Sequence, residues 1–238
     1  RCMMETFAAL LLALAASELL DPCRGGRAEV PGLWALRSAL FLALALLCLG
    51  TWHPVILGLA AGHLALRLAR RLAPKGRLWP FMAENGLLLA GILGTAILLP
   101  GLWAGGLWSA QTVLPGLMAA AAGLAIATAI GGEAIGLLLS GYDAPEQKAG
   151  LPHGGRLIGL LERSMIFLLI LVGQPAGVGF LIAAKSILRF EETRDSNIAS
   201  EYIIIGTLAS FAWAMACAWA TLALIDVLPP IGIPTETP

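Results

Sequence analysis

The chain has 238 residues, of which 58% are hydrophobic and only 13% are charged. Too few polar side chains are present to cover a water-soluble globule, so we predict an integral membrane protein. The 15 basic and 15 acidic residues balance, and no basic stripe interleaved with aromatic residues gives support for a nucleic-acid partner.

Eight apolar segments follow one another along the chain, and they predict an all-α bundle of about eight transmembrane helices in a single domain over residues 1–238. The segments lie at about 3–20, 33–51, 54–69, 82–100, 112–140, 156–172, 176–190 and 201–228. The first is followed by Asp21-Pro22-Cys23-Arg24, without a small-residue cleavage site after a basic leader. We therefore expect a retained helix and not a signal peptide.

The basic residues alternate along the connections between these segments. The connections Thr51 to Pro54, Gly101 to Gln111 and Gly173 to Pro175, and the tail from Pro229, contain no Lys or Arg. Only Arg1 departs from the pattern; the other basic residues lie at or near the odd-numbered connections: Arg24, Arg27, Arg37, Arg67, Arg70, Arg71, Lys75, Arg77, Lys148, Arg156, Arg163, Lys185, Arg189 and Arg194. By the positive-inside rule, the odd connections are cytoplasmic and both termini lie outside.

Two segments are unusual in length. The third has about 15 apolar residues between Pro54 and Arg67, so it is either re-entrant or a short span that Arg67 lengthens by reaching to the interface. We favour the short span, because removing it would invert every later charge assignment. The fifth is long enough to tilt and is interrupted at Gly131-Gly132, beside Glu133, where a kink or a close helix contact is expected.

The sixth and seventh segments predict a helical hairpin that turns at Gly173-Gln174-Pro175. Counted from Gln174, Glu162 and Lys185 lie at nearly equal distances on the two arms, within salt-bridge range, which leaves Arg163 or Arg189 without an obvious acidic partner in the hairpin. Lys185 and Arg189 are four residues apart and so share a helix face, as in a receptor for a phosphate or carboxylate head group. The alternative is that helix-end cations such as Arg189 only anchor the helix at the interface.

The other ionisable residues in the apolar segments are expected at the same cytoplasmic depth. A water-accessible cavity there would be polar enough to hold an ion or a lipid head group, although each residue alone is also compatible with a solvated helix end. The candidate polar cluster comprises Glu162, Arg163, Lys185, Arg189, Glu133, Glu201 and His63. A single histidine cannot hold a metal by itself, and the four cysteines form no CxxC pair, so neither a metal site nor a cofactor is predicted.

Three runs, GRLIGLLER, GQPAGVGFLIAAKSILRF and EYIIIGTLAS, lie between Gly155 and about Ser210. They closely resemble the C-terminal half of a bacterial membrane protein family catalogued as domain of unknown function three-three-zero-seven. The resemblance implies a location in the bacterial inner membrane and an important role for the hairpin. It does not imply an activity.

The resemblance is weak in the N-terminal half, where the family carries a cluster of histidines and carboxylates. Here the first helix offers Glu18 and Asp21 but no histidine, and the third keeps His63 but has Arg67 where the acid would stand. The fourth has Glu84-Asn85, with Leu88 in place of a histidine. If that cluster binds a metal in typical members, the comparison implies that this chain has lost it.

Three functions follow from these patterns. The first is a binding or structural membrane protein whose hairpin recognises an anionic lipid head group or a protein partner. The second is a membrane-embedded enzyme acting on a lipid or isoprenoid phosphate, with Glu162 or Glu133 as acid or base and Arg163, Lys185 and Arg189 stabilising phosphate charge. The third is a small transporter, for which no inverted repeat is evident.

Overall fold

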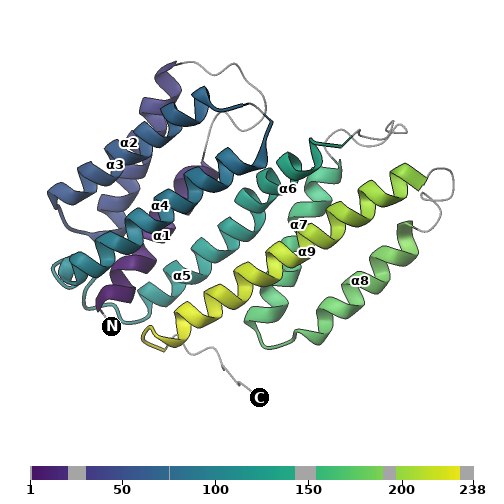
Figure 1. The fold of residues 1–238 in the computed structure, drawn as a ribbon. Coiled ribbons are helices and arrows are strands. Elements are labelled where there is room, and N and C mark those ends of the chain that lie inside the picture. The colour runs from purple at the N-terminus through teal and green to yellow at the C-terminus, as the bar shows by residue number, and fades with distance from the viewer. Residues whose placement is uncertain (1, 21–30, 75, 143–153, 190–196, 231–238) are drawn as a thin grey trace.

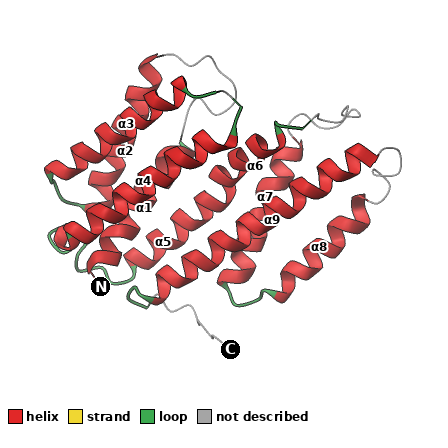
Figure 2. Cartoon of the chain, in the orientation of Figure 1, coloured by secondary structure: helices red, strands yellow, loops and turns green. Residues whose placement is uncertain are grey.

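The computed structural model describes residues 2–20, 31–74, 76–142, 154–189 and 197–230, and all regular secondary structure in these ranges is helical (Figures 1 and 2). The elements are α1 (Cys2–Leu19), α2 (Pro31–Leu49), α3 (Pro54–Leu72), α4 (Leu78–Leu98), the 3-10 turn η1 (Pro100–Leu102), α5 (Leu114–Ala125), the π-helix η2 (Ile126–Ile130), α6 (Gly131–Leu139), α7 (Gly154–Leu171), α8 (Ala176–Arg189) and α9 (Asn197–Asp226).

The predicted all-α class is confirmed, and each predicted apolar segment corresponds to one helix or, for the fifth, to α5, η2 and α6 in succession. The largest errors are four residues, at the start of α4 (82 predicted, Leu78 observed) and of α9 (201 predicted, Asn197 observed). The third segment was predicted to end at 69 but continues to Leu72 as one unbroken helix. It continues because carboxylates of neighbouring helices bind Arg67 and Arg70, so the charges do not end the helix.

Four helical stretches are long and apolar enough to cross a membrane: Cys2–Leu19, Leu78–Leu98, Leu114–Leu139 and Glu201–Asp226. The apolar parts of α2 and α8 are shorter, at Ala35–Leu49 and Ala176–Ile187. The helices α3 and α7 each contain three charged residues, which lowers their hydropathy. The chain therefore has the composition and helix lengths of a membrane protein.

Successive helices run in alternating directions, so their connections lie at two opposite ends of the bundle (Figure 1). At one end the Leu107 amide donates to the Gly50 carbonyl at 3.1 Å, which joins the α2–α3 and α4–α5 connections. At the same end the Trp103 amide donates to Thr6 Oγ1 at 3.2 Å, near the start of α1. At the other end Ser140 Oγ donates to the Gly76 carbonyl at 2.8 Å. The connections that carry the basic residues thus share one end.

The core has two main parts, which α1 and α5 join. In the first, α1 lies among α2, α4 and α5, and its fully buried Ala9, Leu10 and Ala13 pack with Phe41 of α2. The second lies between α5, α7 and α9, around Phe167. Small residues on α1 allow this close approach of helices. The helix α8 lies at the edge of the bundle and packs mainly against α7 (Figure 1).

Gly123 marks the tightest helix contact of the second core. A Cβ atom at this position would overlap Thr221 Oγ1 of α9 and lie 3.0 Å from Phe167 Cζ of α7. Three helices therefore meet at a backbone that has no room for a side chain.

We expect Gly123→Ala to lower the free energy of unfolding by about 1–3 kcal/mol, because the added methyl group forces α5 away from α7 and α9. Thermal unfolding of the purified protein in detergent measures this loss. Gly136→Ala in α6 is the matched control, since nothing lies within 4 Å of a Cβ added there. Equal melting temperatures for the two variants would contradict the tight contact.

Candidate functional site

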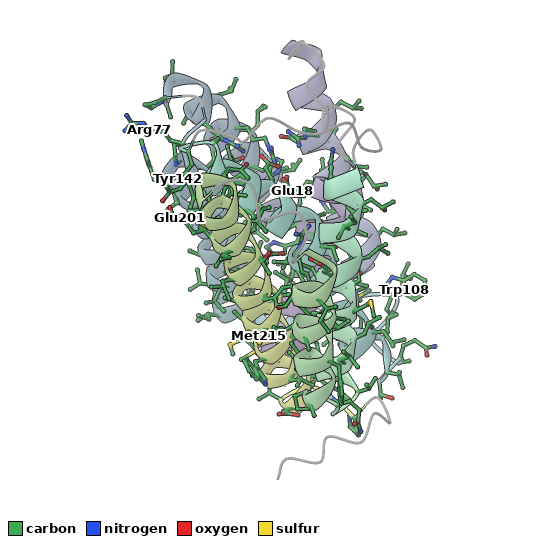
Figure 3. The ribbon with its side chains drawn as sticks, turned by 90° about the vertical axis from the view of Figure 1, so that its right-hand side faces the viewer. Glu18, Arg77, Trp108, Tyr142, Glu201 and Met215 are labelled. Atoms are coloured by element: carbon green, nitrogen blue, oxygen red, sulfur yellow. The ribbon has the colours of Figure 1, made fainter. Side chains whose placement is uncertain are left out.

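Ionisable side chains from five helices meet inside the N-terminal half of the bundle, at the end that carries the basic connections. We call this group the five-helix network; Figure 3 shows one member, Glu18, in the upper part of the bundle. Its members are Glu18 of α1, Arg37 and Ser38 of α2, His63, Arg67 and Arg70 of α3, Glu84 of α4 and Glu133 of α6.

Helix α3 supplies three members of the network from one face. His63, Arg67 and Arg70 stand at positions i, i+4 and i+7, which follow one line along an α-helix. The remaining residues of α3 are mostly apolar and small, so the helix packs closely against α2 and α4. The polar face of α3 is thereby brought against the carboxylates of its neighbours.

Arg67 is the centre of the network. Its Nη2 contacts the Glu18 carboxylate, and its Nε lies 3.4 Å from Glu84 Oε1. The same Nε donates to His63 Nε2 at 3.4 Å, which requires that ring nitrogen to be unprotonated. The His63 proton then lies on Nδ1, which donates to Ser38 Oγ at 3.0 Å. Glu18, Glu84 and His63 are thus held by a single guanidinium.

Arg70 extends the network to α6. Its Nη1 donates to Glu84 Oε2 and its Nη2 donates to Glu133 Oε1, both at 3.0 Å. The Arg70 Cζ atom lies 4.9 Å from the centre of the Phe81 ring, a cation–π distance. On the opposite side, Arg37 Nη2 lies 3.8 Å from Glu18 Oε2. The ion pairs therefore connect α2 to α6 without interruption.

The network is electrically balanced, because its three carboxylates face three guanidiniums. His63 is fully buried, and its ring stacks on Phe41 with 5.2 Å between the ring centres. Charges in an apolar interior are costly unless paired and hydrogen-bonded, and a pair fixes the relative positions of the helices that carry it. The arrangement holds five helices at one depth.

The geometry of the network bears on the predicted loss of a metal cluster. The Arg67 guanidinium lies among the oxygens of Glu18 and Glu84 and the Nε2 of His63, which are ligand types that divalent metals prefer. In the described part of the chain, no group of three His, Cys, Asp or Glu side chains is arranged to hold a metal ion. The positive charge among these groups comes from the chain itself.

The hairpin of α7 and α8 is the second polar region. Gly173 adopts a φ of +73° at the turn, a conformation that favours glycine, and the Gln174 amide donates to the Leu169 carbonyl at 2.7 Å. Lys185 Nζ donates to Glu162 Oε2 at 2.6 Å, so the predicted salt bridge is confirmed. We call these two residues the hairpin pair. The side chain of Arg189 lies outside the described residues, and its stacking on Lys185 stays a prediction.

Arg163 is buried next to the hairpin pair, and its partners are neutral. Its Nη1 donates to Ser210 Oγ of α9 and its Nη2 donates to the Thr128 carbonyl, both at 3.1 Å. No ion pair of Arg163 occurs among the described residues; the sequence predicted that either Arg163 or Arg189 would lack an acidic partner in the hairpin, and the side chain of Arg189 lies outside those residues. A serine hydroxyl and a main-chain carbonyl thus bind the buried guanidinium.

Thr128 belongs to the π-helix η2. The Gly131 amide donates to the Ile126 and Thr128 carbonyls at the end of this turn, and side chains of neighbouring helices donate to the same two carbonyls. Trp213 Nε1 of α9 donates to the Ile126 carbonyl of the same turn at 3.2 Å. Two side chains from α7 and α9 therefore bind the main chain of η2.

The glycine pair Gly131-Gly132 makes room for these two side chains. A Cβ atom at Gly131 would lie 2.5 Å from Trp213 Cδ1, and one at Gly132 would lie 2.9 Å from Arg163 Nη2. The predicted interruption of the fifth segment is present, but it is the π-helix one turn earlier, and the glycines begin α6. These two glycines allow the close helix contact that the sequence also predicted.

The seven candidate residues do not form one group in the structure. His63 and Glu133 belong to the five-helix network, Glu162 and Lys185 form the hairpin pair, and Arg163 binds η2. Glu201 is exposed near the start of α9, at the edge of the bundle (Figure 3). Glu133 and Glu162 thus bind different cations, and the single cavity that would join them stays a prediction.

Sequence reasoning missed three members of the network, Arg37, Ser38 and Arg70. Arg70 is predicted at a connection, although its spacing from His63 and Arg67 places it on the same helix face. Arg37 is predicted only at or near the first connection, and no local pattern in α2 distinguishes it or Ser38. No protein-family model, no curated protein and no solved structure matches the chain. The function is therefore argued from the geometry of the two polar regions.

We expect Glu84→Gln to lower the free energy of unfolding by about 3–5 kcal/mol, because Arg67 and Arg70 both lose a carboxylate partner in a buried position. The loss is measured as a fall in melting temperature in detergent. Glu201→Gln removes the same charge from an exposed position and is expected to change stability by less than about 0.5 kcal/mol. Equal effects of the two substitutions would show that the network does not stabilise the bundle.

Proposed function

We propose that the chain is a multi-pass protein of the bacterial inner membrane, with about eight spans, cytoplasmic odd connections and both termini outside. We propose further that it acts as a binding or structural membrane component, and that the α7–α8 hairpin recognises an anionic lipid head group. The alternating helix directions support the first part, and the distribution of charge supports the second.

The charged helices are compatible with a membrane-spanning role. With a rise of about 1.5 Å per residue, the 19 residues of α3 and the 18 of α7 extend about 28 and 27 Å, close to the thickness of the hydrocarbon layer, about 30 Å. Arg67 and Arg163, which reduce their hydropathy, point into the bundle and are buried there. The 14-residue α8 is shorter and would need its terminal cations to reach the interface.

The observation that carries the lipid-binding proposal is an imbalance of charge in the hairpin. The five-helix network is neutral, whereas α7 and α8 together contain four cations, Arg156, Arg163, Lys185 and Arg189, and one carboxylate, Glu162. Four of the five lie in the halves of these helices remote from the Gly173 turn, and Arg163 lies just past the middle of α7 on the side of the turn. Clustered basic residues at a membrane surface attract anionic head groups, and guanidinium matches phosphate geometry.

The outer face of α8 is suited to the acyl chains of such a lipid. Phe180, Ile182 and Ile187 are exposed, and α8 packs mainly against α7. A lipid whose head group binds the basic end of the hairpin would therefore find an apolar helix surface below it.

The two carboxylates proposed for an enzyme are both engaged. Glu133 accepts a hydrogen bond from Arg70, and Glu162 accepts one from Lys185. A general acid or base must reach the substrate proton, and each of these groups already binds a cation of the chain. This arrangement favours the binding role over catalysis on a lipid phosphate.

The proposed orientation predicts which connections an impermeant reagent reaches. In a variant without the native cysteines, we expect Ser109→Cys to react with a membrane-impermeant maleimide in spheroplasts, and Ser140→Cys to react only in inverted vesicles. Both serines are exposed at opposite ends of the bundle. Labelling of Ser140→Cys from the outside would reverse the assignment.

We expect Arg156→Gln combined with Arg189→Gln to weaken retention of phosphatidylglycerol roughly 30-fold, since each surface cation contributes about 1 kcal/mol to the attraction. The hairpin pair stays intact in this variant, so its fold is preserved. Titration of the purified protein with lipid, followed by native mass spectrometry, measures the effect.

The charge-matched control is Arg24→Gln combined with Arg27→Gln, which removes two cations from another basic connection. Retention of phosphatidylcholine by all three proteins provides the head-group control. If both double variants lose phosphatidylglycerol equally, the attraction is a general surface effect and the hairpin has no special role.

A further inference from the structure

A groove of about 100 Å³ opens on the surface of the bundle between α3 and α4. Gly58, Gly62 and Leu66 of α3 form one side, and Leu87 and Gly91 of α4 form the other. The floor includes Phe41 of α2, whose ring stacks on His63 of the five-helix network. We call it the α3–α4 groove; it is apolar and ends directly above the network.

The glycines of the groove are not required by packing within the chain. Nothing lies within 4 Å of a Cβ atom added at Gly58 or Gly62, and one added at Gly91 would make only an ordinary contact, 3.6 Å from Leu59 Cδ2. Gly123, Gly131 and the other glycines of the core behave differently, because a neighbouring atom fills the space. The missing side chains on α3 therefore leave room for something outside the chain.

We propose that the α3–α4 groove binds an acyl chain of an anionic phospholipid from the leaflet at the α3–α4 connection. Gly62 lies ten residues before Leu72, so it is about 15 Å below the end of α3, at the middle of a hydrocarbon layer about 30 Å thick, the depth that the end of an acyl chain reaches. A helix, about 10 Å across with its side chains, is too wide to enter a space of this volume. A single hydrocarbon chain is narrow enough.

The charges at the end of α3 match the head group. The stretch from Arg67 to Arg77 contains five basic residues and no acidic one. The five-helix network engages Arg67 and Arg70, while Arg77 is exposed. Trp79, exposed two residues later, is of a type that favours the interfacial layer. A phosphate bound at this connection would direct its acyl chain along α3 toward Gly62.

This proposal rests on the membrane location proposed above, but it does not depend on the hairpin. The test uses the full-length protein in phosphatidylcholine vesicles that contain a small fraction of phosphatidylglycerol with a diazirine in the middle of one acyl chain. After illumination, peptide mass spectrometry measures cross-links in the α3 and α4 peptides. We expect cross-links there, and we expect unlabelled phosphatidylglycerol to suppress them more than added phosphatidylcholine.

Gly62→Leu is expected to reduce these cross-links roughly tenfold, because its side chain fills the groove and excludes acyl methylene groups. Leucine has a higher helix propensity than glycine, and its Cβ atom meets no atom of the chain within 4 Å, so we expect the fold to be retained. Gly136→Leu, at an equally open position of α6, is the control and keeps the cross-links. The Arg156→Gln, Arg189→Gln variant also keeps them, since its effect is confined to the hairpin.

Unchanged cross-linking in Gly62→Leu overturns the groove as the binding site. Equal suppression by phosphatidylcholine overturns the choice of an anionic lipid. If Gly62→Leu instead converts a dimer to a monomer in size-exclusion chromatography, a second copy of the chain covers the groove, and the lipid proposal is wrong. The competition experiment uses the unmodified protein, so it decides the matter even if Gly62→Leu does not fold.

Discussion

The arrangement of the N-terminal half depends on the contact of Arg67 with two carboxylates, those of Glu18 and Glu84. A buried guanidinium without a partner would be costly, and each of the two glutamates would be equally costly alone. Together the three charged groups neutralise one another and hold α1, α3 and α4 at fixed relative positions. Arg70 and Glu133 extend the junction to α6, so ion pairs as well as apolar packing fix the register of these helices along the bundle.

The C-terminal half of the chain binds its buried cations differently. Arg163 is buried against a hydroxyl and a carbonyl of the π-helix, and the hairpin pair neutralises only one of the other cations. Within their bounds, α7 and α8 therefore carry more cations than carboxylates, whereas the five-helix network is balanced. This contrast is the physical reason for which we propose recognition at the hairpin.

The helices could be predicted from the sequence because each combines an apolar run with a clear boundary, and the hairpin pair could be predicted because its two residues are related by a local turn. His63 and Glu133 could be placed in one candidate cluster, but the binding of Arg67 and Arg70 to Glu18, Glu84 and Glu133 could not be predicted, because it depends on which helices become neighbours. Arg70 was recoverable from its spacing on α3, but Arg37 was not. No local sequence pattern predicts the π-helix. The side chains that bind its carbonyls, those of Arg163 and Trp213, lie far from it in the sequence.

The position of Glu133 also has a consequence for which part of the chain can complete the network. Helices α1 to α4 supply three of its guanidiniums, Arg37, Arg67 and Arg70, but only two of its glutamates. The third glutamate, Glu133, follows in α6 and binds Arg70. The charges of the network are therefore balanced only by a residue of the fifth apolar segment, and the first four helices cannot balance them alone.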